Sequence, residues 1–230
     1  MNRLFRFVFV RTMPVMFAFL FLGIAFGLLL ERAGYNFLWA LFISTFVYAG
    51  SMQFVLIPFL GSSMGIIAVI LMTLSINSRH MFYGLSFIEK FKSMGKAYPY
   101  MIFSLTDETY SLLCSTKVPE GMNENKVFFF ISLFNHVYWV TGSVLGALIG
   151  GMITFDTTGI DFAMTALFVV IFVEQWLAAR THIPAIIGIV CGIVSLLIFG
   201  PANFILPALI VSIAILLAGK NLIRAKEART

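Results

Sequence analysis

The chain has 230 residues, of which 60% are hydrophobic, 16% aromatic and only 11% charged. A soluble globular domain carries about 25% charged residues, so this composition excludes one. The net charge of +5 comes from basic residues that stand between apolar runs, which favours the membrane surface over nucleic acid as their partner. We therefore expect one all-α, polytopic transmembrane domain over residues 1–230.

Eight apolar segments follow one another along the chain, and a helix of about 20 such residues crosses a bilayer core. They are 12–30, 37–60, 64–88, 98–115, 127–151, 162–178, 183–199 and 203–218. We expect two of them to be broken or re-entrant. Segment 37–60 is interrupted by Ala49, Gly50 and Ser51 near its middle, and segment 98–115 carries five polar residues at its centre between Ser104 and Thr109.

The distribution of basic residues decides between topologies, because Lys and Arg collect in cytoplasmic loops. If both broken segments turn back, about six full spans remain, both termini are cytoplasmic, and thirteen of the fifteen basic residues lie inside. If both cross fully, Lys90, Lys92 and Lys96 lie outside, which the rule disfavours. The sequence therefore favours six spans. Broken helices in lipid need protein or water to satisfy their backbone groups, so both breaks indicate one interior site.

Small residues recur four positions apart, a spacing that lets helix backbones approach closely. The pattern predicts tight helix packing at three places. They are Gly23 with Gly27, Gly142 with Gly146 and Gly150, and Gly188 with Gly192.

Five ionisable residues fall inside apolar segments, where a charge is costly and therefore suggests function. They are Arg79, His80, Asp107, Glu108 and His136. With Asn77 and the break at Gly50, they place polar groups from four segments at one depth, the expected bilayer midplane. Two alternatives remain open: Arg79 forms a buried ion pair with Asp107 or Glu108 that only holds the bundle together, and each histidine is as readily structural as proton-carrying.

The sequence lacks the HExxH, GxSxG, P-loop and GxGxxG motifs. We therefore expect no catalysis, no cofactor and no metal site. A polar centre confined to mid-bilayer favours a transporter with alternating access. The alternatives are a channel or pore for another small solute, and a membrane scaffold whose polar centre only specifies helix pairing.

Four spaced motifs resemble the AzlC family, the large subunit of branched-chain amino acid exporters. They are FVYAGSMQ at 46–53, NSRHMFYG at 77–84, LTDET at 105–109 and TGIDFAMTALF at 158–168. Pro14 and the run GIAFG at 23–27 also fit the family's opening pattern. Within the AGxxQ motif at 49–53, Met52 stands where the family has alanine, a departure that could alter the pocket for the substrate's side chain.

The resemblance implies export of leucine, isoleucine and valine, with methionine as a further candidate, across the bacterial plasma membrane. It also implies a small, separately encoded partner of the AzlD type. The substrate-binding residues we expect are Gly50, Ser51, Gln53, Asn77, Asp107, Glu108 and Thr109. Backbone amides near Gly50 would hold the substrate carboxylate, and Asp107 or Glu108 its ammonium. Proton antiport is the simplest drive, with a proton or charge relay drawn from Arg79, His80, Asp107, Glu108 and His136.

Overall fold

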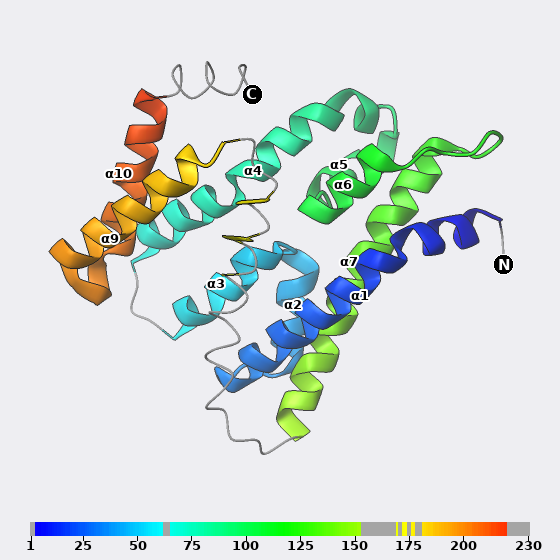
Figure 1. The fold of residues 1–230 in the computed structure, drawn as a ribbon. Helices are drawn as coiled ribbons and strands as arrows, with labels where there is room; N and C mark the ends of the chain where they lie inside the picture. Colours follow the sequence, from blue (N-terminus) through cyan, green and yellow to red (C-terminus); the bar gives the residue numbers. More distant parts are fainter. Residues whose placement is uncertain are drawn as a thin grey trace. The chain divides into compact units, whose positions relative to one another are not determined.

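The computed structural model describes residues 3–61, 65–152 and 181–219, together with 169, 172–173 and 176–177. Every element in this part of the chain is a helix, as predicted (Figure 1). The helices are α1 (Arg3–Arg32), α2 (Phe37–Phe46), α3 (Gly50–Leu60), α4 (Ile66–Lys92), the 3-10 helix η1 (Gly95–Ala97), α5 (Tyr98–Phe103), α6 (Asp107–Ser115), α7 (Glu124–Met152), α9 (Ile183–Asn203) and α10 (Ile205–Ala218).

Within the described ranges, three helices are long and apolar enough to cross a membrane: Arg3–Arg32, Glu124–Met152 and Ile183–Gly200. Many of their large apolar side chains are exposed, such as Phe21 at 74% and Leu197 at 80%. Contact of such apolar surface with water is unfavourable, whereas contact with lipid tails is not. The all-α membrane fold is therefore confirmed in outline, and the six-span count stays a prediction.

Both predicted breaks are present. Helix α2 ends at Phe46 and α3 begins at Gly50, while α5 ends at Phe103 and α6 begins at Asp107. We call the residues between these helices the first and second interruptions. In the first, Tyr48 adopts a φ of 41°, a left-handed conformation that costs a residue other than glycine about 1–2 kcal/mol.

The described helices form two compact units. One contains α1 to α3, α4 from Ile76 onwards, and η1 to α7. The other contains the start of α4 with α9 and α10, and the last two pack against each other. The predicted boundary between their segments is found at Gly200, whose φ of 71° breaks the helical geometry.

Helices α1 and α7 pack side by side along much of their length (Figure 1). They run parallel, because Phe5 contacts Phe130 near their starts and Leu28 lies against Gly150 near their ends. The glycines predicted for close packing form this contact. A Cβ atom added at Gly146 would lie 2.7 Å from the Ile24 Cα atom, a distance that real Cβ atoms do not reach.

The third glycine pair behaves differently. A Cβ atom at Gly188 or Gly192 would meet none of the described heavy atoms within 4 Å. The close packing predicted there is not found among the described residues, because four-residue spacing marks a smooth helix face without supplying a partner for it.

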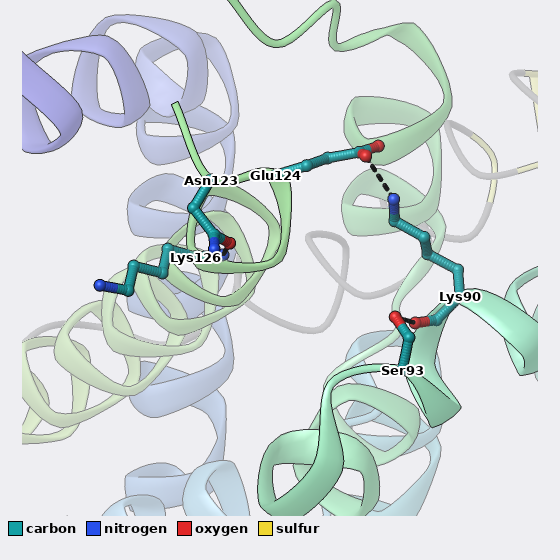
Figure 2. A network of polar contacts seen from close by, with 5 residues as sticks. All are labelled: Lys90, Ser93, Asn123, Glu124 and Lys126. Atoms are coloured by element: carbon teal, nitrogen blue, oxygen red, sulfur yellow. Dashed lines mark hydrogen bonds and ion pairs between the residues drawn. The ribbon is translucent and has the colours of Figure 1, made fainter. Parts of the chain in front are cut away.

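Each interrupted segment returns to the end at which it starts. The Tyr35 hydroxyl, just before α2, donates a hydrogen bond to the carbonyl of Leu60 at the end of α3 (3.2 Å). Lys90, in the last turn of α4, forms an ion pair with Glu124 at the start of α7, as Figure 2 shows. These two contacts bracket the two interrupted segments, so α2–α3 and α5–α6 are hairpins.

The α5–α6 hairpin is anchored by an apolar core drawn from α1, α4, α5, α6 and α7. Its buried side chains are Val8, Phe91, Met101, Leu105, Leu113, Val127, Phe128 and Ile131. Because Leu105 lies in the second interruption itself, the core fixes the bend between the two half-helices as well as the helices.

We predict that Gly146→Leu destabilises the protein by about 1–3 kcal/mol, the usual cost of overpacking, because the new side chain meets the α1 backbone. Thermal unfolding in detergent measures the change. Gly188→Leu is the matched control: it gains the same helix propensity of about 1 kcal/mol without a described neighbour within 4 Å. Equal melting temperatures for the two variants would contradict the packing role of Gly146.

Candidate functional site

The two interruptions meet near the middle of α7. The first contributes Tyr48 and the start of α3, and the second contributes Thr106 and the start of α6. On α7 the facing residues are Asn135, His136 and Trp139, of which Asn135 is 0% and Trp139 3% exposed. We call this group the midpoint site. It lies entirely within the larger unit, on helices fixed by the α1–α7 packing.

Gln53 links three helices at the first interruption. Its side chain is fully buried. Its Nε2 donates to the Ser44 hydroxyl of α2 (3.1 Å), and its Oε1 accepts from the Trp139 indole Nε1 (2.9 Å). A buried amide is costly unless it is hydrogen-bonded, so this one side chain ties the two halves of the broken helix to each other and to α7.

The start of α3 has no side-chain cap. Its N-cap residue, Ala49, offers no side-chain hydrogen bond, so the first-turn amide groups carry partial positive charge without a side-chain acceptor at the cap. Gly50 gives these amides room on the side facing α7, because an added Cβ atom would already lie 3.4 Å from the Trp139 ring.

The start of α6 has the opposite character. Thr106 caps it by accepting from the Thr109 amide (3.3 Å), and Asp107 and Glu108 occupy its first turn, where the helix dipole favours negative charge. Asn135 on α7 donates from its Nδ2 to the fully buried Thr109 hydroxyl (3.0 Å). The second interruption is therefore capped by its own threonine and held by α7.

Tyr48 connects the two interruptions. Its ring centroid lies 4.2 Å from that of His136 and 6.1 Å from that of Phe103 at the end of α5. Its buried hydroxyl lies beside Thr106 and Thr109 without an ordinary hydrogen bond to either. Glu108 is close enough to act on it electrostatically, so the acidic start of α6 lies near the loop that precedes α3.

His136 faces both hairpins. Its Nδ1 shares a hydrogen bond with the Tyr100 hydroxyl of α5 (3.2 Å). Its Nε2 lies near the carbonyls of Ser44 and Thr45, the last turn of α2, without an ordinary hydrogen bond to them. The His136 ring therefore contacts α5 and the last turn of α2 at the same time.

Several polar atoms of the midpoint site have no hydrogen-bond partner among the described residues. They are the Asn135 Oδ1, the hydroxyls of Ser104 and Ser132, and the His136 Nε2. Buried polar atoms are normally paired, so these acceptors and donors are candidates for contacts with a bound solute or with water.

The site residues expected on α4 connect to α6 through aromatic rings. The Asn77 carbonyl hydrogen-bonds His80 Nδ1 (3.2 Å). The centroid of the His80 ring lies 6.1 Å from that of Tyr83. Tyr83 in turn stacks on Tyr110 of α6, with 4.5 Å between the ring centroids. The Arg79 side chain is outside the described part of the chain, so its ion pair with Asp107 or Glu108 stays a prediction.

The sequence did not single out some residues that build the site. Asn135 and Trp139 share one helical face with Gly142 and Gly146, and all four are buried. Their bonds to the interruptions were not predicted. Tyr48, Ser44 and Tyr100 were missed as well, because their roles depend on chain segments far apart in sequence.

Discontinuous helices that meet around a buried polar centre place this chain among the polytopic helical membrane proteins. A family model described as AzlC protein matches residues 14–153, and the chain belongs to the AzlC family. No solved structure matches it significantly.

Three relatives show the reach of this similarity. A Bacillus subtilis protein named branched-chain amino acid transport protein AzlC is 39% identical over 92% of this chain and 84% of its own length. A Helicobacter pylori membrane protein is 40% identical over 95% of this chain and 96% of its own length. The inner membrane protein YgaZ of Escherichia coli is 27% identical over 73% of this chain and 70% of its own length. The chain is thus a multi-pass bacterial membrane protein.

Proposed function

We propose that the chain is a secondary transporter that exports leucine, isoleucine and valine, with methionine as a further candidate. The observation that carries the proposal is the meeting of the α3 and α6 starts against the middle of α7, the first without a side-chain cap and the second with two acids in its first turn. Half-helices that meet inside the bilayer form the substrate sites of many secondary transporters. The substrate class is supported by the name of the Bacillus subtilis relative.

The two half-helix starts suit the two charges of an amino acid. The α3 start, without a side-chain cap, would take the carboxylate on the amides of Gly50 and Ser51, with Gln53 holding the turn in place. Asp107 or Glu108 at the α6 start would take the ammonium, with Thr109 beside them. The proximity of Tyr48 to Glu108 supports a single substrate bridging both starts.

An apolar cluster next to α3 would hold the branched side chain. Phe26 packs edge-on against Phe54 (5.7 Å between centroids) and lies 6.5 Å from the Trp139 ring. Met52 is buried at 4% exposure in the same helix. Its flexible thioether can adapt to several aliphatic shapes, so Met52 is our candidate for the residue that sets the preference among substrates.

Proton antiport is the drive we propose. Asp107, Glu108 and His80 are the proposed carriers, and Arg79 would balance the acids. His136, between Tyr100 and the α2 carbonyls, is a second route by which a proton could reach the site. Asn77 would bind substrate when α4 closes over the two starts.

The six-span topology with cytoplasmic termini is part of the proposal. The Tyr35–Leu60 hydrogen bond and the Lys90–Glu124 ion pair join the ends of the two interrupted segments. In an arrangement where both segments cross, each pair would be separated by the membrane. A small membrane subunit of the AzlD type, which the family resemblance implies, would complete the exporter.

We predict that proteoliposomes loaded with unlabelled leucine take up labelled leucine by exchange, which requires a carrier cycle and excludes a pore or a scaffold. Gly50→Leu should lower exchange at least tenfold, because its side chain must displace Trp139. Gly50→Ala is the control, since its Cβ makes an ordinary 3.4 Å contact. Failure of exchange with and without an AzlD-type subunit would overturn the proposal, and full exchange by Gly50→Leu would remove α3 from the site.

For the acids, we predict that Asp107→Asn or Glu108→Gln abolishes proton-driven efflux, measured after a pH jump, while leucine-for-leucine exchange survives. Glu120→Gln, in an exposed loop, is the control. If the acid only balances Arg79, its loss leaves a buried cation unpaired, costing about 3–5 kcal/mol. The acid would then have only a structural role if two results are found together. The single variants are unstable, and adding Arg79→Gln restores stability while proton-driven efflux stays intact.

For topology, we predict that a cysteine at Asp156 reacts with an impermeant thiol reagent from outside, whereas one at Lys92 reacts only after the membrane is opened. The background must lack the native thiols, of which Cys114 is exposed and Cys191 buried. Labelling of Lys92→Cys in intact cells, with Asp156→Cys shielded, would reject the six-span arrangement.

A further inference from the structure

A cleft lies at the N-terminal end of α1, away from the midpoint site. Its volume is about 570 Å³, and three arginines line it: Arg3, Arg6 and Arg11. Its remaining walls are apolar or proline side chains, including Val10 and Met122. No acidic residue is among its described lining residues, so the cleft combines a strongly positive rim with an apolar floor.

Arg11 is held in place at this rim. Its Nη2 donates to the Ser115 carbonyl (2.8 Å), and its Nε donates to the Thr116 hydroxyl (3.2 Å). These contacts tie α1 to the end of α6 and fix one guanidinium at the inner edge of the cleft. Arg6 and Arg3 are exposed on the same helix, about one and two turns further toward its N-terminus.

An exposed apolar stripe continues from the cleft along α1. Val10 is 63%, Phe17 61% and Phe21 74% exposed, and their spacing of seven and then four residues keeps them on one helix face. At 1.5 Å per residue, the stripe runs about 16 Å from Val10 to Phe21. A positive rim above a long apolar face matches a molecule with an anionic head and an extended hydrocarbon tail.

The depth of the arginines agrees with this match. Helix α1 has 30 residues and is therefore about 45 Å long, whereas the hydrocarbon core is about 30 Å thick. The apolar run starts after Arg11, so Arg6 lies about 7.5 Å beyond the core boundary. That is the level of lipid phosphate groups.

We propose that the cleft binds one anionic phospholipid, with its phosphate among Arg3, Arg6 and Arg11 and one acyl chain along Val10, Phe17 and Phe21. The site is separate from the proposed transport function and does not depend on it. Its occupant stabilises the contact between α1 and the α5–α6 hairpin, because Arg11 takes part in both.

The test uses the full chain in detergent, titrated with dioleoyl-phosphatidylglycerol or dioleoyl-phosphatidylcholine. Native mass spectrometry counts bound lipid, and thermal unfolding reports stabilisation. We expect phosphatidylglycerol to bind and raise the melting temperature, and phosphatidylcholine to do neither. In the double variant Arg3→Gln/Arg6→Gln the apparent affinity should fall about thirtyfold, which is about 1 kcal/mol per basic residue converted at 1.4 kcal/mol per tenfold.

The matched control is Lys92→Gln/Lys96→Gln, which removes two exposed charges from elsewhere in the larger unit and should leave phosphatidylglycerol binding unchanged. Equal losses in the two double variants would overturn the proposal. Equal binding of phosphatidylglycerol and phosphatidylcholine to the unmodified chain would also overturn it. This second test does not depend on whether a variant folds. Equal stabilisation by inorganic phosphate would assign the cleft to a free anion, and an adduct with the mass of a small protein would assign it to a protein partner; either result rejects the lipid.

Discussion

Inside a bilayer there is no water to satisfy the backbone groups that an interrupted helix leaves open, and the larger unit is organised around that constraint. Helix α7 holds both interruptions in place through side-chain hydrogen bonds. Trp139 donates to Gln53 at the first, and Asn135 donates to Thr109 at the second. The close glycine packing between α1 and α7 fixes these two helices against each other. Both hairpins are therefore held by one rigid helix pair.

The same constraint separates the two starts chemically. The second interruption is satisfied locally, because Thr106 caps α6 and two acids complement its dipole. At the first, the Gln53 side chain binds Ser44 and Trp139, and the N-cap residue of α3 offers no side-chain hydrogen bond. The site thus pairs a helix start without a side-chain cap with a helix start that carries two acids. This asymmetry gives a bound zwitterion a defined orientation in the transport function proposed here.

Much of this architecture was readable from local sequence. Small residues at 49–51 and acids at 107–108 stand in apolar surroundings where they disfavour a continuous span, and both breaks lie where those residues predict them. Contacts between distant segments were not readable. Gly188 and Gly192 repeat the spacing of Gly142 and Gly146, yet only the latter pair meets a described partner, because spacing describes one surface and packing needs two. The Tyr35–Leu60 bond, which closes the first hairpin, likewise has no local signal.

Tyr48 couples a backbone conformation to a side-chain position. A left-handed tyrosine is higher in energy than an extended or helical one, and it persists here while its ring packs at a tilt against the ring of His136, with 4.2 Å between the centroids. If the ring leaves this contact, the left-handed backbone is no longer stabilised, and Tyr48 relaxes toward ordinary helical angles. The joint between α2 and α3 therefore stores backbone strain that the position of the Tyr48 ring maintains. Displacing the ring would release this strain and straighten the joint.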